Sequence, residues 1–174
     1  MSYVLKESFG TTADDYESVQ TSWAVIRGAM SFVTASAYVL TQAEHMLTKV
    51  GTPSTYNLTA YIYSDGVGKP GTLLGTSINT IPVSSLSTSS GTYYAFQFAG
   101  VSLSSSTTYY MAIAGDDTVD TNYWRMWSDS TSETGIFSRY EAPDWVEYYV
   151  SNIQGMIKTY VYSGPFPFAF PPMG

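Results

Sequence analysis

The sequence predicts an all-β protein, an antiparallel β-sandwich, and three observations support that fold class. Apolar and polar residues alternate in several short runs, which is typical of strands that bury one face. Clusters of Gly, Ser, Asp and Pro separate these runs, so turns join consecutive strands. No long stretch has the periodicity of a helix, which disfavours α/β and helical folds. We therefore expect two packed sheets of short strands.

Four runs show the alternation most clearly. Their inward-facing residues are Leu58, Ala60 and Ile62; Tyr94, Phe96 and Phe98; Tyr109, Met111 and Ile113; and Ile157, Thr159 and Val161. Turns are expected between them, at residues 64–71, 87–91, 102–108 and 114–117. Residues 11–20 are compatible with a short helix or an acidic loop, and we expect the loop.

A length of 174 residues suits one domain. We expect residues 1–29 to form an N-terminal strand and acidic loop that belong to the sandwich or pack on it. Residues 30–163 are expected to form the sandwich itself, and residues 164–174 a Pro/Phe-rich C-terminal arm. Prolines remove backbone donors and hold a chain extended, so this tail is predicted to lie outside the sheets. The predicted molecule is one sandwich with extended N- and C-terminal arms.

Composition excludes several classes of partner. Charged residues make up 12% of the chain and the net charge is −7. The seven Lys and Arg are scattered singly, whereas nucleic-acid binding requires a basic cluster, so nucleic acid is excluded. There is no cysteine for a disulfide or a thiolate metal site. No stretch is apolar enough to span a membrane, and the first residues lack the pattern of a signal peptide. We expect synthesis in a cytoplasm and no membrane partner.

The sequence contains no constellation that predicts an enzyme. Its one histidine, His45, alternates inward with Ala43 and Leu47, and a single histidine supports neither a zinc site nor a Ser-His-Asp triad. The glycines of residues 66–71 formally fit a Gly-x-Gly-x-x-Gly phosphate loop. That loop requires a helix after it, whereas this motif contains Pro70 and precedes residues with a strand pattern. We therefore expect no catalytic residues.

Three aspartates, Asp116, Asp117 and Asp120, crowd one predicted loop. Carboxylates on a loop, together with backbone carbonyls, are ligands that calcium prefers. The loop therefore supports two interpretations, a calcium site or a solvated acidic turn. No other cofactor is expected.

Aromatic side chains gather late in the sequence. Alternation places Tyr123 and Trp127 on one face of a predicted strand and Trp124 on the other, and Trp145 follows further along. One face is expected to join the core. The remaining rings provide a glycan-stacking platform or a subunit contact, or they pack between the sheets.

The C-terminal arm places phenylalanines at alternate positions of a proline-rich segment. Such a segment is stiff and loses little entropy on binding, so we expect it to dock on a partner subunit. The alternative is an arm that folds back on its own sandwich. The residues expected to make the contact are Pro165, Phe166, Phe168, Phe170, Pro171 and Pro172.

Four motifs carry a family resemblance: Val-Gly-Thr-Pro at 50–53, Leu-Thr-Ala-Tyr-Ile-Tyr at 58–63, Gly-Lys-Pro-Gly-Thr-Leu-Leu-Gly at 68–75, and Val-Ser-Leu-Ser-Ser-Ser-Thr-Thr-Tyr-Tyr at 101–110. Together they resemble the choice-of-anchor type R β-sandwich domain, over about residues 30–163. That family occurs in phage structural proteins and bacterial surface proteins. The resemblance implies a jelly-roll-like sandwich similar to carbohydrate-binding modules, and it implies no catalytic residues.

These features predict a non-enzymatic phage virion protein, made in the host cytoplasm. We expect a capsid decoration or fibre-like accessory protein that contacts neighbouring virion subunits through its arms. A homo-oligomer is expected, and a trimer suits the symmetry of capsid lattices. The alternative is a carbohydrate-binding module on an extracellular surface, which recognises polysaccharide through exposed Trp and Tyr.

Overall fold

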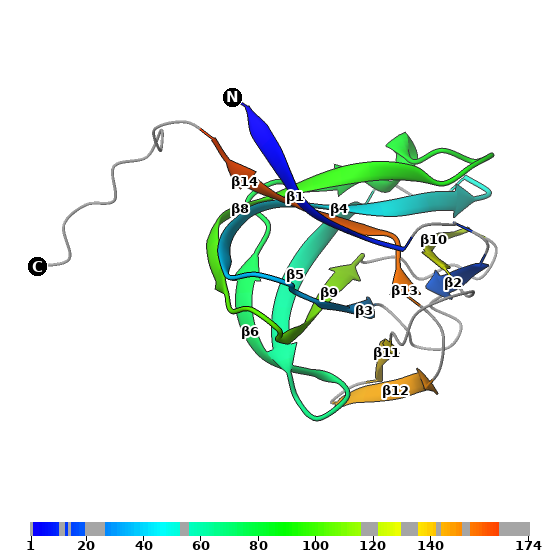
Figure 1. The fold of residues 1–174 in the computed structure, drawn as a ribbon. Coiled ribbons are helices and arrows are strands. Elements are labelled where there is room, and N and C mark those ends of the chain that lie inside the picture. Colours follow the sequence, from blue (N-terminus) through cyan, green and yellow to red (C-terminus); the bar gives the residue numbers. More distant parts are fainter. Residues whose placement is uncertain are drawn as a thin grey trace, which may run out of the picture.

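Two antiparallel β-sheets pack against each other and form a β-sandwich (Figure 1). The computed structural model describes residues 2–10, 13, 15–19, 27–52, 56–115, 122–129, 136–141, 144–150 and 154–163. Within these ranges nearly all regular structure is strand, with one short 3-10 helix, η2 (Val83–Ser85). The predicted all-β sandwich is confirmed.

The first sheet is organised around its longest strand, β4. Its strands are β1 (Tyr3–Phe9), β2 (Asp15–Val19), β4 (Tyr38–Val50), β8 (Thr92–Leu103), β10 (Tyr123–Asp129), β13 (Gln154–Gly155) and β14 (Ile157–Tyr162). β8 pairs with one edge of β4, and β14 and β10 pair in succession with the other. Met156, which precedes β14, links β10 and β4. Its N–H donates to the Trp127 carbonyl (3.1 Å), and its carbonyl accepts from the Met46 N–H (3.1 Å).

The second sheet has the strand order β12-β11-β3-β9-β5-β6. Its strands are β3 (Arg27–Val33), β5 (Asn57–Asp65), β6 (Pro70–Thr76), β9 (Thr108–Ala114), β11 (Ile136–Glu141) and β12 (Asp144–Val150), and the short β7 (Ile81–Pro82) also pairs with β5. Every strand pair in both sheets is antiparallel, as expected for strands joined mainly by turns.

The main core lies between the inner faces of the two sheets. In β5, Leu58, Ala60 and Ile62 are fully buried, as the alternation predicts, whereas Thr59 and Tyr61 are only partly buried. The other predicted inward runs also contribute to this core, although Tyr94 is only partly buried and packs against its margin, and Val161 is only partly buried and lies outside it. The buried side chains from both sheets include Phe32, Leu40, Leu47, Phe96, Met111, Ile113, Met126 and Ile157.

A second, smaller cluster forms on the opposite face of the second sheet. There Tyr63 and Tyr110 are buried together with small alanines, and Trp145 packs against them. The Tyr63 and Trp145 rings lie 5.7 Å apart between centroids, although β5 and β12 are far apart in the strand order. The sheet therefore curls around this cluster, with β11 and β12 below β3 and β9 in Figure 1. Because of this curl, both faces of β9 are buried.

One prediction for the N-terminal part is wrong. Residues 15–19 form β2, not an acidic loop, and β2 pairs with Trp124–Ser128 of β10. The physical reason is that β10 uses its other edge for β4, so the backbone groups on this edge need a partner. The strand expected before this loop does belong to the sandwich, since β1 pairs with β14 over its length and Phe9 enters the core.

The glycine motif at residues 66–71 is the hairpin turn between β5 and β6. The Gly66 N–H donates to the Lys69 carbonyl (2.7 Å), and the Gly68 N–H donates to Asp65 Oδ1 (2.9 Å). The backbones of Gly66 and Gly71 touch, because a Cβ on Gly66 would lie 2.8 Å from the Gly71 Cα. Close backbone approach in a turn explains both glycines, and the motif is not followed by a helix.

Candidate functional site

The strand β10 separates the predicted aromatic residues onto two faces. Trp124 and Met126 point inward and are 2% and 0% exposed, whereas Tyr123, Arg125 and Trp127 are partly exposed on the outer face. Trp124, one of the four rings considered for a glycan or subunit contact, therefore does not make one, because its ring fills part of the core. Tyr123 and Trp127 do share one surface.

Trp145 belongs to the other sheet. Its ring packs edge-on against Tyr63 and against Tyr140, at 5.7 and 5.5 Å between centroids. Nearby, the Arg27 guanidinium lies 5.7 Å from the centroid of Tyr61 and 5.0 Å from that of Tyr140. These contacts make Trp145 part of the small second cluster, so the structure does not bring it together with Tyr123 and Trp127.

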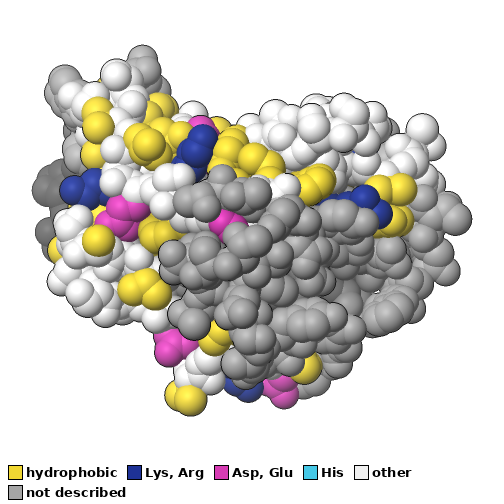
Figure 2. Space-filling view, turned by 45° about the vertical axis from the view of Figure 1, so that its right-hand side comes forward, with side chains coloured by type: hydrophobic (Ala, Val, Ile, Leu, Met, Phe, Trp, Pro, Cys, Tyr) yellow, Lys and Arg dark blue, Asp and Glu magenta, His cyan; other side chains and the backbone are white. Residues whose placement is uncertain are grey.

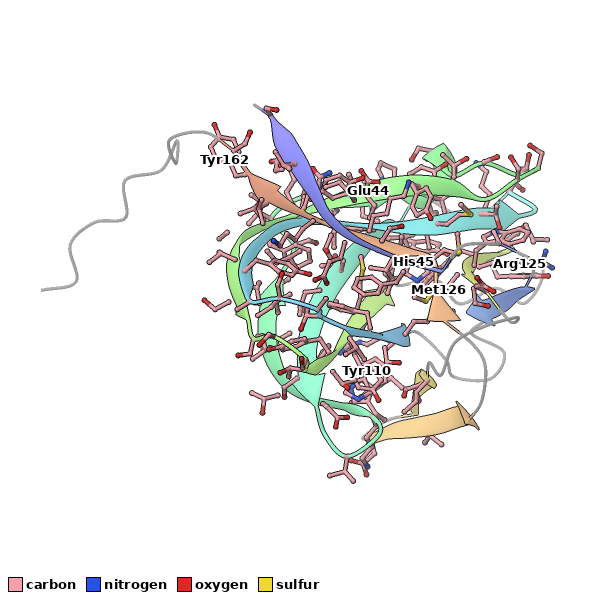
Figure 3. All side chains as sticks on the ribbon, in the orientation of Figure 1. Glu44, His45, Tyr110, Arg125, Met126 and Tyr162 are labelled. Atoms are coloured by element: carbon pink, nitrogen blue, oxygen red, sulfur yellow. The ribbon has the colours of Figure 1, made fainter. Side chains whose placement is uncertain are left out.

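The outer face of the first sheet, opposite the core, gathers aromatic and polar side chains around β4. We call this surface the β4 outer face. It comprises Gln42, Glu44, Met46 and Thr48 of β4, Tyr93 of β8, Lys158 and Tyr160 of β14, and Tyr123, Arg125 and Trp127 of β10. Figure 3 shows Glu44 on this outer side of the sheet and its neighbour His45 on the inner side.

Glu44 occupies the centre of the β4 outer face. Its Oε2 accepts a hydrogen bond from the Tyr160 hydroxyl (2.8 Å), and its Oε1 accepts one from Gln42 Nε2 (3.2 Å). Burial raises the pKa of Tyr160, and the hydrogen bond to Glu44 raises it further. The phenol therefore keeps its proton and holds the carboxylate in place.

Lys158 lies beside Glu44 in the pairing of β14 with β4. Its Nζ sits 3.7 Å from the centroid of the Tyr93 ring, a cation–π contact. Burial and then the nearby Glu44 raise the pKa of Tyr93, so this phenol is also neutral. The acidic Glu44 and the basic Lys158 are therefore neighbours across the two strands. Tyr160 contacts Glu44, and Tyr93 contacts Lys158.

Trp127 is held against the sheet by two features. Its Nε1–H donates to Thr48 Oγ1 (3.1 Å), which satisfies the one polar group of the indole. Gly91 leaves room for it, because a Cβ there would lie 2.4 Å from Met46 Sδ and 3.2 Å from Trp127 Cδ1. The ring is thus fixed in orientation and remains partly exposed.

At the end of the same face, the Arg125 guanidinium lies 5.3 Å from the centroid of the Tyr123 ring, and Nη2 donates to the Tyr123 hydroxyl (2.9 Å). Charges elsewhere are sparse. In Figure 2 the charged side chains drawn in colour are few among the hydrophobic and uncharged ones. The β4 outer face therefore combines planar rings with a small number of fixed donors and acceptors, an arrangement suited to binding.

His45 is a core residue and not part of this face. It is fully buried, its Nδ1 lies 3.1 Å from the Met46 carbonyl, and its Nε2 has no hydrogen-bond partner in the described structure. Burial lowers its pKa to about 4, so the ring is neutral at pH 7. The predicted inward position next to Ala43 and Leu47 is confirmed.

Two predicted sites fall outside the described residues. They are the aspartate loop with Asp116, Asp117 and Asp120, and the C-terminal arm of residues 164–174. In the part of the chain that is described, no three His, Asp or Glu side chains lie close enough to hold a metal ion. The same part contains no helix long and apolar enough to cross a membrane.

No family model and no curated protein matches the chain. Sequence reasoning missed Glu44, Tyr93, Lys158 and Tyr160 as site residues. Each occupies an outward position of a strand, and Tyr93 and Tyr160 border the predicted inward positions Tyr94 and Thr159. Alternation along each strand could have placed these residues on the outer face. It could not have shown that they lie together, because β4, β8 and β14 are far apart in the sequence.

Proposed function

We propose that the chain is a non-enzymatic structural protein of a phage virion, a capsid decoration or fibre-like accessory protein. It docks on neighbouring subunits as a homo-oligomer. The observation that carries this proposal is that the first and last described segments of the sandwich, at Ser2 and Ser163, lie next to each other. The Ser163 N–H and Oγ both donate to the Ser2 carbonyl, at 3.2 and 3.0 Å. The last described residue, Ser163, therefore lies at the corner at which β1 begins (Figure 1).

The edge strand at this corner also suits a subunit contact. β1 pairs with β14 on one side and has no partner strand on the other among the described residues. Its Val4 and Leu5 side chains are 48% and 50% exposed. An exposed edge with apolar side chains is a surface on which a second chain can pair or pack. The resemblance to a domain of phage structural proteins supports a location on the virion.

Deletion of residues 165–174 tests the docking role of the arm. We expect the full chain to form a homo-oligomer and the shortened chain to be monomeric, as measured by light scattering coupled to size exclusion. The melting temperature is expected to stay unchanged, because the sandwich is closed by β14 before the arm begins. Deletion of Met173 and Gly174 alone is the matched control and should leave assembly intact. An unchanged oligomer with a lowered melting temperature would show that the arm packs on its own sandwich.

A second candidate function is carbohydrate binding, and the β4 outer face specifically favours it. Trp127 and Tyr160 present partly exposed rings on either side of the Glu44 carboxylate along β4. Aromatic rings beside fixed hydrogen-bonding groups are the usual composition of a site for a polar ligand with apolar faces. The two functions are compatible, because a virion protein can expose this face while its arm contacts a neighbour.

A further inference from the structure

We propose that the C-terminal arm of one copy adds an antiparallel strand to the free edge of β1 in a second copy, with its phenylalanines beside Tyr3 and Leu5. The inference rests on the proposed docking role of the arm, and it names the surface that receives the arm. Among the described residues β1 is an edge strand, because β14 is the only strand that pairs with it. Such an edge presents a row of backbone donors and acceptors to a further strand.

The pairing of β1 with β14 shows which residues of β1 face the free edge. The Ser163 N–H donates to the Ser2 carbonyl (3.2 Å), in register with the rest of the β1–β14 ladder. Consecutive residues of a strand point their backbone groups to opposite edges, so Ser2 and Val4 face β14. The N–H and carbonyl groups of Tyr3 and Leu5 therefore point to the free edge.

The side chains of Tyr3 and Leu5 form an apolar surface beside this edge. They lie on the outer face of the sheet, opposite Tyr162 and Tyr160 of β14. Tyr162, which is labelled in Figure 3, meets the Tyr3 ring edge-on at 6.0 Å between centroids. Leu5 is half exposed. A strand laid against the free edge would cover Leu5 and extend the row of rings.

The sequence of the arm fits a strand that pairs along only one of its edges. Phenylalanines occupy even positions and prolines, apart from Pro172, occupy odd ones. These residues are Phe166, Phe168 and Phe170, and Pro165, Pro167 and Pro171. In an extended strand of this sequence the phenylalanine N–H groups point to one edge, and the prolines, which have no N–H, stand on the other. Proline is tolerated on the outer side of an edge strand, so the arm can pair with β1 and close the sheet.

Antiparallel pairing determines where the rings of the arm lie. Residues that exchange hydrogen bonds in an antiparallel ladder stand directly opposite each other, with their side chains on the same face. Two phenylalanines of the arm therefore stand opposite Tyr3 and Leu5. Alternate residues of a strand are about 7 Å apart, which gives both pairs the same spacing.

The arm of the same copy fits this edge less well. Ser163 lies beside the start of β1, so a chain that continued from it would have to turn back and run parallel to β1. Parallel pairing is slightly less stable. In a parallel ladder each residue bonds to the two neighbours of the residue opposite, so the rings would lie beside Val4, on the inner face. A second copy is therefore the source of the arm that we propose for this edge.

Leu5→Asp in the full chain tests the receiving edge. We expect the dissociation constant of the homo-oligomer, measured by analytical ultracentrifugation, to rise about tenfold or more, because the arm would cover a carboxylate. Val4→Asp is the matched control, since Val4 is equally exposed and lies on the other face. It should assemble like the wild type. Melting temperatures establish that both variants are folded.

Proline substitutions test the pairing of the arm. Phe168→Pro and Phe168→Ala both remove the ring, but only proline also removes the N–H, so Phe168→Pro should assemble at least tenfold more weakly than Phe168→Ala. Ala169→Pro, at an odd position, should assemble like the wild type. Mixed in equal amounts, the Leu5→Asp and Phe168→Pro chains should form a mixed pair in native mass spectrometry. The intact arm of the first can dock on the intact β1 of the second.

The outcomes separate the receiving edge from the docking role of the arm. If the Phe168→Pro chain loses the oligomer while Leu5→Asp keeps it, the arm docks elsewhere, so the inference is wrong and the proposed function stands. Loss of assembly by Val4→Asp alone would overturn the antiparallel direction. Equal assembly of Phe168→Pro and Phe168→Ala would contradict strand pairing. Failure of the mixed pair to form would contradict docking between copies at this edge. A wild type that stays monomeric would contradict both proposals.

Discussion

Ile62→Asp is expected to abolish soluble expression of the protein. Ile62 is fully buried in the main core and stands opposite Met111 of β9. An aspartate there would either bury a carboxylate without a partner or expose the core, and it would also lose the packing of the isoleucine. The cost of several kcal/mol is comparable to the whole stability of a typical domain, about 5–15 kcal/mol. Leu58→Asp, on the same face, is expected to behave in the same way.

Ile78→Asp provides the matched control, because Ile78 is 61% exposed. The same substitution at that position should leave the soluble yield and the circular dichroism spectrum unchanged. If Ile62→Asp were instead soluble with the wild-type melting temperature, the assignment of this face of β5 to the core would be wrong.

Acid is expected to destabilise the sandwich through His45. Its pKa is lowered from 6.5 to about 4 in the folded protein, first by burial, while the hydrogen bond to Met46 acts weakly in the opposite direction. The unfolded chain therefore binds a proton at a higher pH than the folded chain. The contribution of the neutral, buried His45 ring to the free energy of unfolding is fully present above pH 6.5. It is lost as the pH falls toward 4, and the total loss is about 3 kcal/mol.

His45→Leu should remove this dependence. The cross-strand neighbours of His45 are Ile157 and Tyr94, and the site is fully buried, so an apolar side chain fits the surroundings. We expect urea unfolding at pH 4, 5, 6 and 7 to show a smaller loss of stability for the variant than for the wild type. The carboxylates are the same in both proteins. The difference between the two pH profiles therefore measures the contribution of His45 alone. Identical pH profiles would mean that His45 binds a proton equally well in the folded and the unfolded chain, and the prediction would be wrong.

The strands with strict alternation could be predicted because their signal is local. β5 and β14 each place buried residues at every second position, and the glycines at 66 and 71 mark the hairpin between β5 and β6. β2 could not be predicted in this way. Residues 15–19 are held by backbone pairing with β10, and pairing between distant segments leaves no periodic trace in a short polar sequence.

The same distinction applies to the candidate site. Alternation within β10 correctly placed Tyr123 and Trp127 on one face and Trp124 on the other, but only the packing of the two sheets shows that the Trp124 face is the core. The cluster around Glu44 unites residues from β4, β8 and β14, which only the sheet pairing brings together. The burial of Tyr63 likewise depends on the curl that carries Trp145 to it.

Cryo-electron microscopy of the phage particle encoded by the same genome tests the proposed virion role most directly. The proposal predicts density for this sandwich at regularly repeated positions on the particle, with residues 164–174 in contact with a neighbouring subunit. Mass spectrometry of the purified particle should then detect the chain in a matching copy number. A complete particle map without such density, from particles that lack the chain, would contradict the proposal.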